Sequence, residues 1–321
     1  MITNRLDGST IPVQLAERDR VCDAVARIAV ERGDSDAVIY ADEHLNYSQL
    51  LARVTLLREL VNHVEEPLHG GRVGVLGHRT VLTPVAMFAA HLAGHPFVVL
   101  DPAAPAKLMA GMVTDVGVHV TVDPRDGHVR ATGVTAAVPA DEAYVLFTSG
   151  STGAPRGVSV SQRNLAVSTA ARLEVYRGFG TPRFLLPSPF HFDSSMAGIW
   201  GTLAVGGALV VAREDERLDP CETVALINRH RITHVLAVPN LYTEILHAVR
   251  ADGGGSCASL RVAICAGEHL PQDTVRLHFD TVPGVTLINE YGPTECTVWS
   301  TYKRYDRPGA PRSACRSPVP W

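Results

Sequence analysis

Lysine is almost missing from this chain of 321 residues, in which Lys107 and Lys303 are the only two. Arginine supplies the other cations, and 29 basic residues against 33 acidic ones leave a formal net charge of -4. A balance of this kind provides no extended basic surface for a phosphate backbone. We therefore expect no nucleic-acid partner.

Long apolar runs and closely paired cysteines are also missing. No uninterrupted apolar stretch reaches the length of a membrane span, and the first 20 residues are mixed and polar, unlike a signal peptide. The six cysteines are scattered, without the short paired spacings of zinc sites or disulfide frameworks. We expect a cytoplasmic protein that contacts no membrane.

Strand-like and helix-like patterns alternate along the chain. Residues 71–76, 97–100 and 118–122 predict strands that are apolar on both faces, and residues 81–93 predict an apolar helix between the first two. The same alternation continues after residue 161. Strands that are buried on both faces indicate parallel sheets covered by helices, so the predicted fold class is α/β.

Glycine and hydroxyl residues are densest in the segment 147–158, Phe-Thr-Ser-Gly-Ser-Thr-Gly-Ala-Pro-Arg-Gly-Val, which follows a predicted strand at 143–147. Glycines allow backbone N–H groups to converge on an anion, hydroxyls add donors, and Arg156 adds a cation. We interpret the segment as a phosphate-binding loop. A surface linker is the weaker alternative because the flanks are apolar. The segment is not a P-loop, since no Lys-Ser/Thr pair closes it.

A second segment with functional residue types covers 291–295, Tyr-Gly-Pro-Thr-Glu. A tyrosine ring can stack on a nucleobase, a threonine hydroxyl can bind phosphate, and a glutamate can hold Mg²⁺. A simple Gly-Pro turn with a capping threonine would explain the segment about as well when it is taken alone. The segment follows a predicted strand at 286–289, and in open α/β sheets ligands bind at that end of the strands. We therefore favour the functional interpretation.

Asp193 lies between Phe192 and two serines in apolar surroundings. A carboxylate there needs a cationic partner from the protein or from a ligand. An apolar helix follows directly, so Asp193 is also a candidate N-cap, and both roles can hold together. His191 is similarly open between packing and catalysis.

Taken together, these segments resemble the adenylate-forming superfamily of acyl-CoA synthetases, luciferases and adenylation domains of nonribosomal peptide synthetases. Segment 147–158 resembles the signature loop of that superfamily, and 289–295 its second nucleotide motif. Segments 45–50 and 92–101 resemble two upstream motifs of the peptide-synthetase branch. The Phe-Asp-x-Ser sequence at 192–195 resembles the amino-acid-recognition motif of that branch.

The resemblance, which runs from about residue 23 to about residue 308, implies an architecture. We expect two stacked αβαβα subdomains of an adenylation-domain N-terminal core, with an incomplete accessory β-barrel. Residues 1–160 would form the first subdomain and end in the glycine-rich loop. Residues 161–308 would form the second, with the substrate pocket and the second nucleotide motif, and 309–321 an irregular tail.

The resemblance also implies roles for individual residues. The expected catalytic residues are Thr148, Arg156, Thr294 and Glu295, the last of which would hold Mg²⁺. The expected ATP-binding residues are Thr148, Ser149, Gly150, Ser151, Thr152, Gly153 and Arg156 for the β- and γ-phosphates, Gly267, Glu268, Asn289 and Tyr291 for the adenine, and Thr294 for the α-phosphate. Asp193 would pair with the α-ammonium group of an amino acid. The expected side-chain pocket consists of Ser194, Ala197, Leu236, Ile264, Ala266, Glu290, Val298 and Trp299.

The implied reaction is ATP-dependent activation of an amino acid to aminoacyl-AMP with release of pyrophosphate, in nonribosomal peptide or related secondary-metabolite biosynthesis, antibiotics included. The pocket predicts a small or medium side chain, with a polar or cationic group accommodated near Glu290. A carrier protein or a separate C-terminal subdomain is the expected partner. Two alternatives stay open: a catalytically silent binding remnant or assembly partner, and an acyl- or aryl-CoA-type ligase.

The sequence also departs from the family pattern. Arg156 replaces the usual lysine, which keeps the charge but changes the donor geometry, and Gln162 replaces a common histidine. The ribose-binding aspartate, the hinge and the C-terminal domain with its lysine are not found, and Lys303 lies too near the second nucleotide motif to be that lysine. We expect full activity to need that domain. A truncated gene, a frameshift or a split enzyme would each explain the ending.

Overall fold

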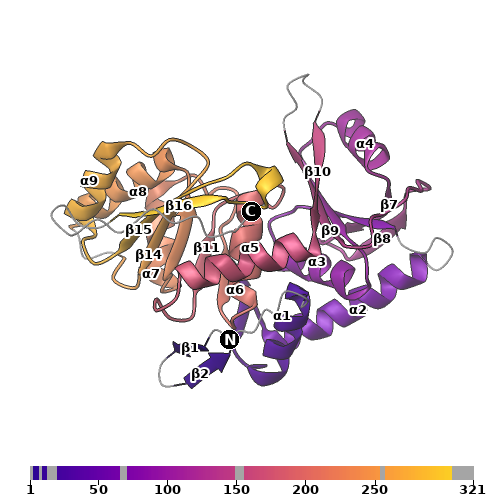
Figure 1. Cartoon of the computed structure of the whole chain (residues 1–321), viewed down its shortest axis with the longest axis horizontal. Coiled ribbons are helices and arrows are strands. Elements are labelled where there is room, and N and C mark those ends of the chain that lie inside the picture. The colour runs from indigo at the N-terminus through magenta and orange to yellow at the C-terminus, as the bar shows by residue number, and fades with distance from the viewer. Residues whose placement is uncertain are drawn as a thin grey trace.

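The computed structural model describes residues 3–6, 9–12, 20–65, 71–148, 155–253 and 257–305. Within these ranges the chain forms two large sheets and a separate strand pair. Figure 1 shows the two large sheets in opposite halves of the molecule. The small pair consists of β1 (Thr3–Leu6) and β2 (Ser9–Pro12).

Six strands form the first sheet in the order β10-β9-β6-β5-β7-β8. Their bounds are β5 (Arg72–Leu76), β6 (Phe97–Leu100), β7 (Val118–Asp123), β8 (His128–Ala131), β9 (Glu142–Thr148) and β10 (Arg156–Ser161). The four inner strands are parallel, and antiparallel β8 and β10 form the edges. The strands predicted from apolar runs are therefore confirmed, and their parallel pairing agrees with burial on both faces.

Eight strands form the second sheet in the order β16-β15-β14-β13-β11-β12-β3-β4. Their bounds are β3 (Asp36–Tyr40), β4 (Glu43–Asn46), β11 (Arg183–Leu186), β12 (Ala208–Val211), β13 (His234–Ala237), β14 (Val262–Cys265), β15 (Thr286–Tyr291) and β16 (Thr301–Tyr305). The expected boundary near residue 161 falls between β10 and the next helix. Strands β3 and β4 nevertheless add to this sheet, because β3 pairs with β12. Strands β3 and β4, which the expected division assigns to the first subdomain, thus belong to the second sheet.

Helices cover both faces of each sheet. Their bounds are α1 (Val21–Glu31), α2 (Tyr47–Glu65), α3 (Leu82–Leu92), α4 (Ala106–Asp115), α5 (Gln162–Val175), α6 (Asp193–Leu203), α7 (Pro220–Arg229), α8 (Pro239–Ala251) and α9 (Gln272–Thr281), with a short 3₁₀ helix η1 (Thr294–Cys296). One core joins α1, α2, α3, α5 and α6 to the inner faces of both sheets. A second core lies under α7, α8 and α9, and a third under α4.

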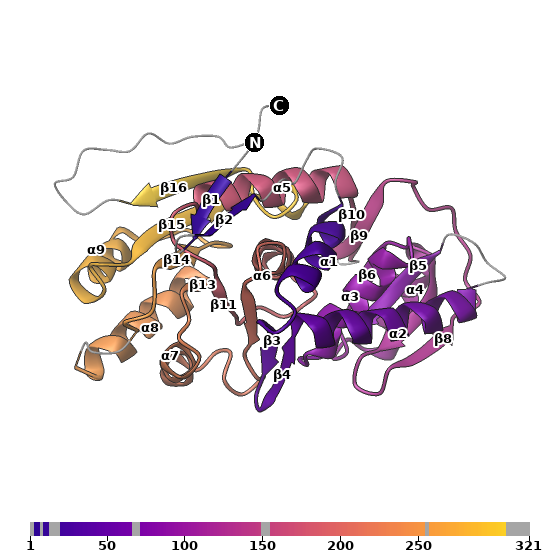
Figure 2. The same cartoon turned by 90° about the horizontal axis from the view of Figure 1, so that it is seen from below.

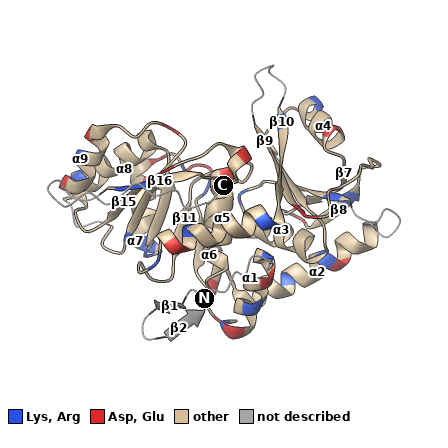
Figure 3. Ribbon diagram, viewed as in Figure 1, with Lys and Arg blue, Asp and Glu red and all other residues tan. Residues whose placement is uncertain are grey.

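The layers therefore run α, β, α, β, α, with the middle helices shared by both sheets; Figure 2 shows α1, α3 and α6 between them. This confirms the predicted α/β class with two sheets. The residues that the structure describes form no closed barrel. Among those residues, no helix is long and apolar enough to cross a bilayer. Basic and acidic residues are interspersed along the visible helices in Figure 3.

Aromatic stacking in the middle layer fixes the two halves relative to each other. Trp200 on α6 is fully buried and stacks on His91 of α3, with ring centroids 5.1 Å apart. The Nε2 atom of His91 lies 2.7 Å from the carbonyl oxygen of Ala143 on β9, with which it hydrogen-bonds. Burial lowers the pKa of His91 to about 4, so the ring is neutral at pH 7. The helix that begins with Asp193 is thereby held against the strand that leads to the glycine-rich loop.

Candidate functional site

The glycine-rich segment links two antiparallel strands, β9 and β10. Thr148 closes β9 and pairs with Arg156, which opens β10. Thr148 is half-buried and Arg156 is exposed, so the cation is free to approach a ligand. The predicted loop residues Ser149, Gly150, Ser151, Thr152 and Gly153 lie outside the described residues.

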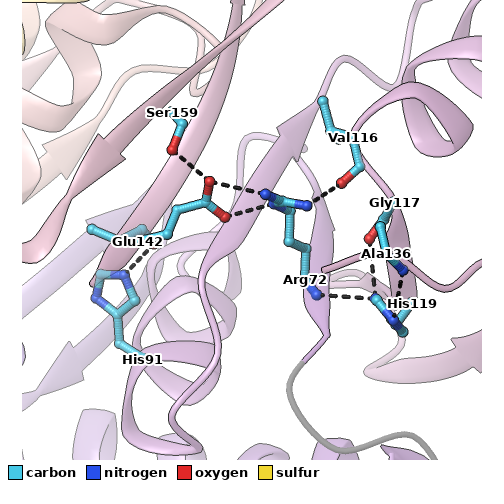
Figure 4. A network of polar contacts seen from close by, with 9 residues as sticks. Arg72, His91, Val116, Gly117, His119, Ala136, Glu142 and Ser159 are labelled. Carbon is cyan, nitrogen blue, oxygen red and sulfur yellow. Dashed lines mark hydrogen bonds and ion pairs between the residues drawn. The ribbon is translucent and has the colours of Figure 1, made fainter. Parts of the chain in front are cut away.

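A buried ion pair holds the base of this hairpin (Figure 4). Arg72 on β5 makes two contacts with the carboxylate of Glu142 on β9, from Nε at 2.5 Å and from Nη2 at 3.0 Å. Arg72 also donates to the carbonyl oxygen of Val116, and the hydroxyl of Ser159 on β10 donates to Glu142. Four chain segments are thus tied together on the side away from the loop. This arrangement makes the hairpin a rigid support.

The predicted adenine contacts meet at the ends of two neighbouring parallel strands, β14 and β15. Gly267, just after β14, has a φ of +88°, a conformation that favours glycine. The side-chain oxygen of Asn289 is buried without a hydrogen-bond partner among the described residues, and the ring of Tyr291 is 70% exposed. Glu268 is exposed beside them. An unpaired acceptor next to an open aromatic ring fits an adenine with its amino group.

The segment after Tyr291 folds back tightly on itself. A Cβ atom at Gly292 would lie 2.5 Å from the Cα atom of Trp299, so only glycine allows this approach. The N–H of Ser300 donates to the carbonyl oxygen of Tyr291 at 2.8 Å. Thr297 and Val298 both have positive φ, at 60° and 80°, which is strained for β-branched residues. The close packing holds η1 in place.

Asp193 and Thr294 are in direct contact. The hydroxyl of Thr294 on η1 donates to Oδ2 of Asp193 at 2.8 Å, across 101 residues of sequence. Burial raises the pKa of the Asp193 carboxyl, and the hydrogen bond from Thr294 partly offsets that rise. Phe192, not Asp193, occupies the cap position of α6, so the interpretation of Asp193 as the N-cap is wrong. Asp193 is the first helical residue, where the helix dipole favours a carboxylate.

Glu295, the expected Mg²⁺ ligand, is exposed on η1 next to Thr294. No group of three metal-ligating side chains occurs among the described residues. A single carboxylate nevertheless fits Mg²⁺, which proteins usually bind through one or two carboxylates together with substrate phosphates. The site therefore suits a metal ion that arrives with a nucleotide.

Five of the expected pocket residues belong to the middle core. It contains Ala197, Leu236 and Ile264, with Ala266 and Val298 packed against it. Ser194 lies outside this core. It hydrogen-bonds with Ser188 at 3.0 Å and lines a large cavity.

Glu290 is not the free acid that the pocket pattern suggests. Its Oε2 atom accepts a hydrogen bond from Nη2 of Arg172 at 2.9 Å, and its Oε1 accepts one from the hydroxyl of Tyr176. Both partners come from the region of α5, more than 110 residues earlier. The expectation of a cation-binding group at Glu290 is therefore wrong for this structure, because Arg172 already neutralises the carboxylate. No local sequence pattern could have identified this pair.

The large cavity that Ser194 lines has a volume of about 780 Å³ and lies between the two halves of the molecule. Its wall includes His191, two residues before α6, and Ser194 on α6, together with Asp101, Arg79 and Leu218. The Nδ1 atom of His191 lies 3.9 Å from Oδ1 of Asp101. Burial lowers the pKa of His191, although Asp101 opposes that shift. Phe192 and Ser194, the residues on either side of Asp193, both line this cavity, so it reaches the immediate neighbourhood of that carboxylate.

Comparisons with known proteins agree with this geometry. Residues 25–138 and 121–321 match the family described as AMP-binding enzyme. Bacitracin synthase 3 of Bacillus licheniformis is 33% identical over 287 residues, which make up 83% of this chain and 4% of that protein. The chain thus spans a small fraction of the curated relative.

Solved structures give the same result. The nonribosomal peptide synthetase FmoA3 superposes with a TM-score of 0.78 at 25% identity, over 90% of this chain and 33% of FmoA3. A form of FmoA3 with AMPPNP bound superposes with a TM-score of 0.76. PA1221, which contains adenylation and PCP domains of a nonribosomal peptide synthetase, gives 0.77 at 25% identity, over 92% of this chain and 62% of PA1221.

Proposed function

Because the chain belongs to the AMP-binding enzyme family, we propose that it activates an amino acid with ATP, forming aminoacyl-AMP and releasing pyrophosphate. The setting would be nonribosomal peptide or related secondary-metabolite biosynthesis. The observation that carries the proposal is the 2.8 Å hydrogen bond between Thr294 and Asp193. It joins the residue proposed to bind the α-phosphate to the residue proposed to bind the α-ammonium group.

This contact supports a site in which the two reactants would lie side by side. An amino acid held through its ammonium group at Asp193 would present its carboxylate near Thr294, where the α-phosphorus would lie. Bringing two reactants together in this way supplies much of the acceleration for a reaction that uses no covalent protein nucleophile. The partly buried carboxylate of Asp193 also gains more from a cationic substrate than a fully exposed one would, because partial burial disfavours its unpaired charge.

Charge neutralisation would come from Arg156 and from a metal ion at Glu295. Mg²⁺ would supply electrostatic stabilisation of the phosphate oxygens. Thr148 lies opposite Arg156 at the loop entrance and would add a hydroxyl donor. We assign the adenine to Asn289 and Tyr291, on the strength of the unpaired oxygen and the exposed ring.

A carrier protein is the acceptor that we propose for the activated amino acid. The large cavity supports this, because it reaches Ser194 beside Asp193 and opens between the two halves of the chain. A separately encoded C-terminal subdomain is the other partner that we propose, and full activity would depend on it. The contact between Asp193 and Thr294 favours an amino-acid substrate over the acyl- or aryl-CoA alternative, in which His191 would carry more of the function.

ATP–pyrophosphate exchange across a panel of amino acids tests the proposal, with the full chain alone and with an added C-terminal adenylation subdomain. We expect exchange with a few uncharged amino acids. Asp193→Asn should lower it roughly 10- to 100-fold, the value of one charge-assisted hydrogen bond. Asp126→Asn is the matched control, since Asp126 is partly exposed and pairs only with nearby groups. ATP binding without exchange for any amino acid would instead identify a silent remnant.

A further inference from the structure

We propose that Arg172 is a specificity-determining residue that restricts this site to amino acids with uncharged side chains. The inference rests on the proposed function, because it concerns the same amino-acid pocket. The class of substrate follows from the charge balance at the pocket floor, by which we mean the side chains of Arg172, Glu290, Tyr176 and Trp299. The residue that sets this balance lies on α5, outside the segments that carry the family resemblance.

The two charged side chains of the pocket floor pair with each other. The side chains of Arg172 and Glu290 are 3% and 2% exposed, and they form an ion pair of 2.9 Å. The hydroxyl of Tyr176 donates to the other carboxylate oxygen, and the Arg172 guanidinium carbon lies 4.8 Å from the centre of the Trp299 ring. One cation, one anion and one neutral phenol share the space. The floor therefore has no net charge.

This floor lies where a substrate side chain would end. Asp193, the proposed ammonium ligand, and Ala197 are one turn apart on α6, about 6 Å along the helix axis. Ala197 and Gly201 lie on the same face of α6 and line a small cavity of about 30 Å³ together with Arg172 and Tyr176. Ala197, Glu290 and Trp299 all belong to the expected side-chain pocket, and Arg172 pairs with Glu290 and lies over the Trp299 ring, so we place the end of a substrate side chain at this pair.

Neither sign of charge finds a free partner at this floor. A cationic side chain would compete with Arg172 for Glu290, and an anionic one would compete with Glu290 for Arg172. Burying a charge without a partner is costly, so both are rejected. His234 also lines the cavity and carries no charge at pH 7, because burial lowers its pKa to about 4. Uncharged side chains avoid this cost.

One atom at the floor favours a polar but uncharged group. The Nε atom of Arg172 is buried and has no hydrogen-bond partner among the described residues. A hydroxyl or carboxamide oxygen on the substrate would satisfy that donor without disturbing the ion pair. The predicted class therefore includes both apolar side chains and side chains with a neutral acceptor.

The test measures binding of hydrolysis-resistant aminoacyl sulfamoyl-adenosines to the full chain by isothermal titration calorimetry. Four side chains form two pairs of matched size: norvaline with 2,4-diaminobutyrate, and glutamine with glutamate. We expect wild-type protein to bind each neutral member at least tenfold more tightly than its charged partner. Binding does not require turnover, so the readout is independent of any added C-terminal subdomain.

Two substitutions should change this ranking in opposite directions. Arg172→Met leaves Glu290 unpaired, so the affinity for the diaminobutyrate analogue relative to the norvaline analogue should rise at least tenfold. Glu290→Gln leaves Arg172 unpaired, so the affinity for the glutamate analogue relative to the glutamine analogue should rise at least tenfold. The double variant removes both charges and should restore the neutral preference. Arg177→Met is the matched control, since Arg177 lies just after α5 and pairs with Glu174 at the surface.

The outcomes separate the two proposals. Unchanged ranking in variants that still bind and still show wild-type circular dichroism would overturn the role of Arg172 alone. If Arg172→Met does not fold, Glu290→Gln decides by the glutamate ratio, since it preserves the shape of the side chain. Failure of wild-type protein to bind any of the four analogues would overturn the proposed function and this inference with it.

Discussion

The described residues include two buried arginine–glutamate pairs, one in each half, and they differ in what they leave unsatisfied. Arg72 binds Glu142 through two nitrogens and uses a third for a backbone carbonyl. Arg172 binds Glu290 through one nitrogen, and its Nε has no partner among the described residues. In the first pair, Nε, Nη1 and Nη2 of the arginine all donate hydrogen bonds within the protein. In the second pair, the Nε donor of the arginine is unused within the described ranges and lies beside a small cavity.

Their positions explain the difference. The first pair lies at the start of β5 and β9, at the end of the hairpin away from the phosphate loop. The second lies near the end of β15, at the edge of the sheet where ligands bind in open α/β folds. A buried ion pair at a strand beginning serves the fold. A similar pair at a strand end can also select a ligand.

The largest predicted effect breaks the first pair. Glu142→Gln removes the charge that two nitrogens of Arg72 and the hydroxyl of Ser159 share. Loss of one partner in a buried pair costs about 3–5 kcal/mol. We expect a decrease of that size in the free energy of unfolding, measured by urea denaturation.

Glu290→Gln is the matching change in the second pair and should cost less. The small cavity beside Arg172 can admit a water molecule, and the Trp299 ring remains as a partner for the guanidinium. Glu174→Gln, at a surface pair, should stay within about 0.5 kcal/mol of wild type. Equal losses at Glu142 and Glu290 would contradict the distinction between a structural pair and a selective one.

The same contrast shows what the sequence could and could not predict. Apolar runs predicted the parallel strands, and residue types indicated which strand ends are candidates for the site. The contact between Arg172 and Glu290 could not be read from the sequence, because its partners are 118 residues apart and only the packing of α5 brings them together. The pairing of β3 with β12 was hidden for the same reason, because these two strands are far apart in the sequence.

The candidate site shows the same distinction between features that one segment determines and features that depend on tertiary packing. Asp193 was recognisable as a carboxylate in need of a partner, yet its position as first helical residue and its bond to Thr294 depend on where α6 and η1 meet. Candidate residues could be recognised wherever one short segment held all of them. The charge balance of the pocket could not be predicted, because it depends on residues from separate elements.

Acid should affect the surroundings of the two ion pairs equally, which isolates the ion pairs as the source of the difference. A buried neutral histidine lies in each half, His91 under β9 and His234 beside the small cavity, and burial lowers the pKa of each to about 4. His278 on α9 is also fully buried with a pKa lowered to about 4, so His91 and His234 are compared through single substitutions. The unfolded chain binds these protons near pH 6.5, whereas the folded chain binds them only near pH 4. Their contribution to stability is therefore complete above pH 6.5 and is lost as the pH falls toward 4.

Each histidine should account for about 2 kcal/mol of the stability lost between pH 7 and pH 5. His91→Gln and His234→Gln should each reduce that loss by this amount in urea titrations at the two pH values. A much smaller reduction for His234 than for His91 would mean that the cavity hydrates His234, and that the two regions differ in general burial rather than in their ion pairs.

The smallest predicted effects come from the two hydroxyls that complete the carboxylates. Tyr176→Phe leaves the buried Glu290 with one hydrogen bond, so we expect a loss of about 1.5 kcal/mol in the free energy of unfolding. Ser159→Ala should cost about 0.5 kcal/mol, because Glu142 keeps both nitrogens of Arg72 and Ser159 is exposed enough for water to replace it.

Binding should separate these two hydroxyls more clearly than stability does. Tyr176→Phe makes the Glu290 carboxylate more available, so the preference for norvaline over diaminobutyrate analogues should fall a few-fold, whereas Ser159→Ala should leave that ratio unchanged. The hydroxyl of Tyr176 stays protonated across the accessible pH range, because burial and the neighbouring Glu290 raise its pKa well above the ordinary value. A changed ratio in Ser159→Ala would show that the hairpin base also shapes the pocket, and the two ion pairs would then belong to one coupled network.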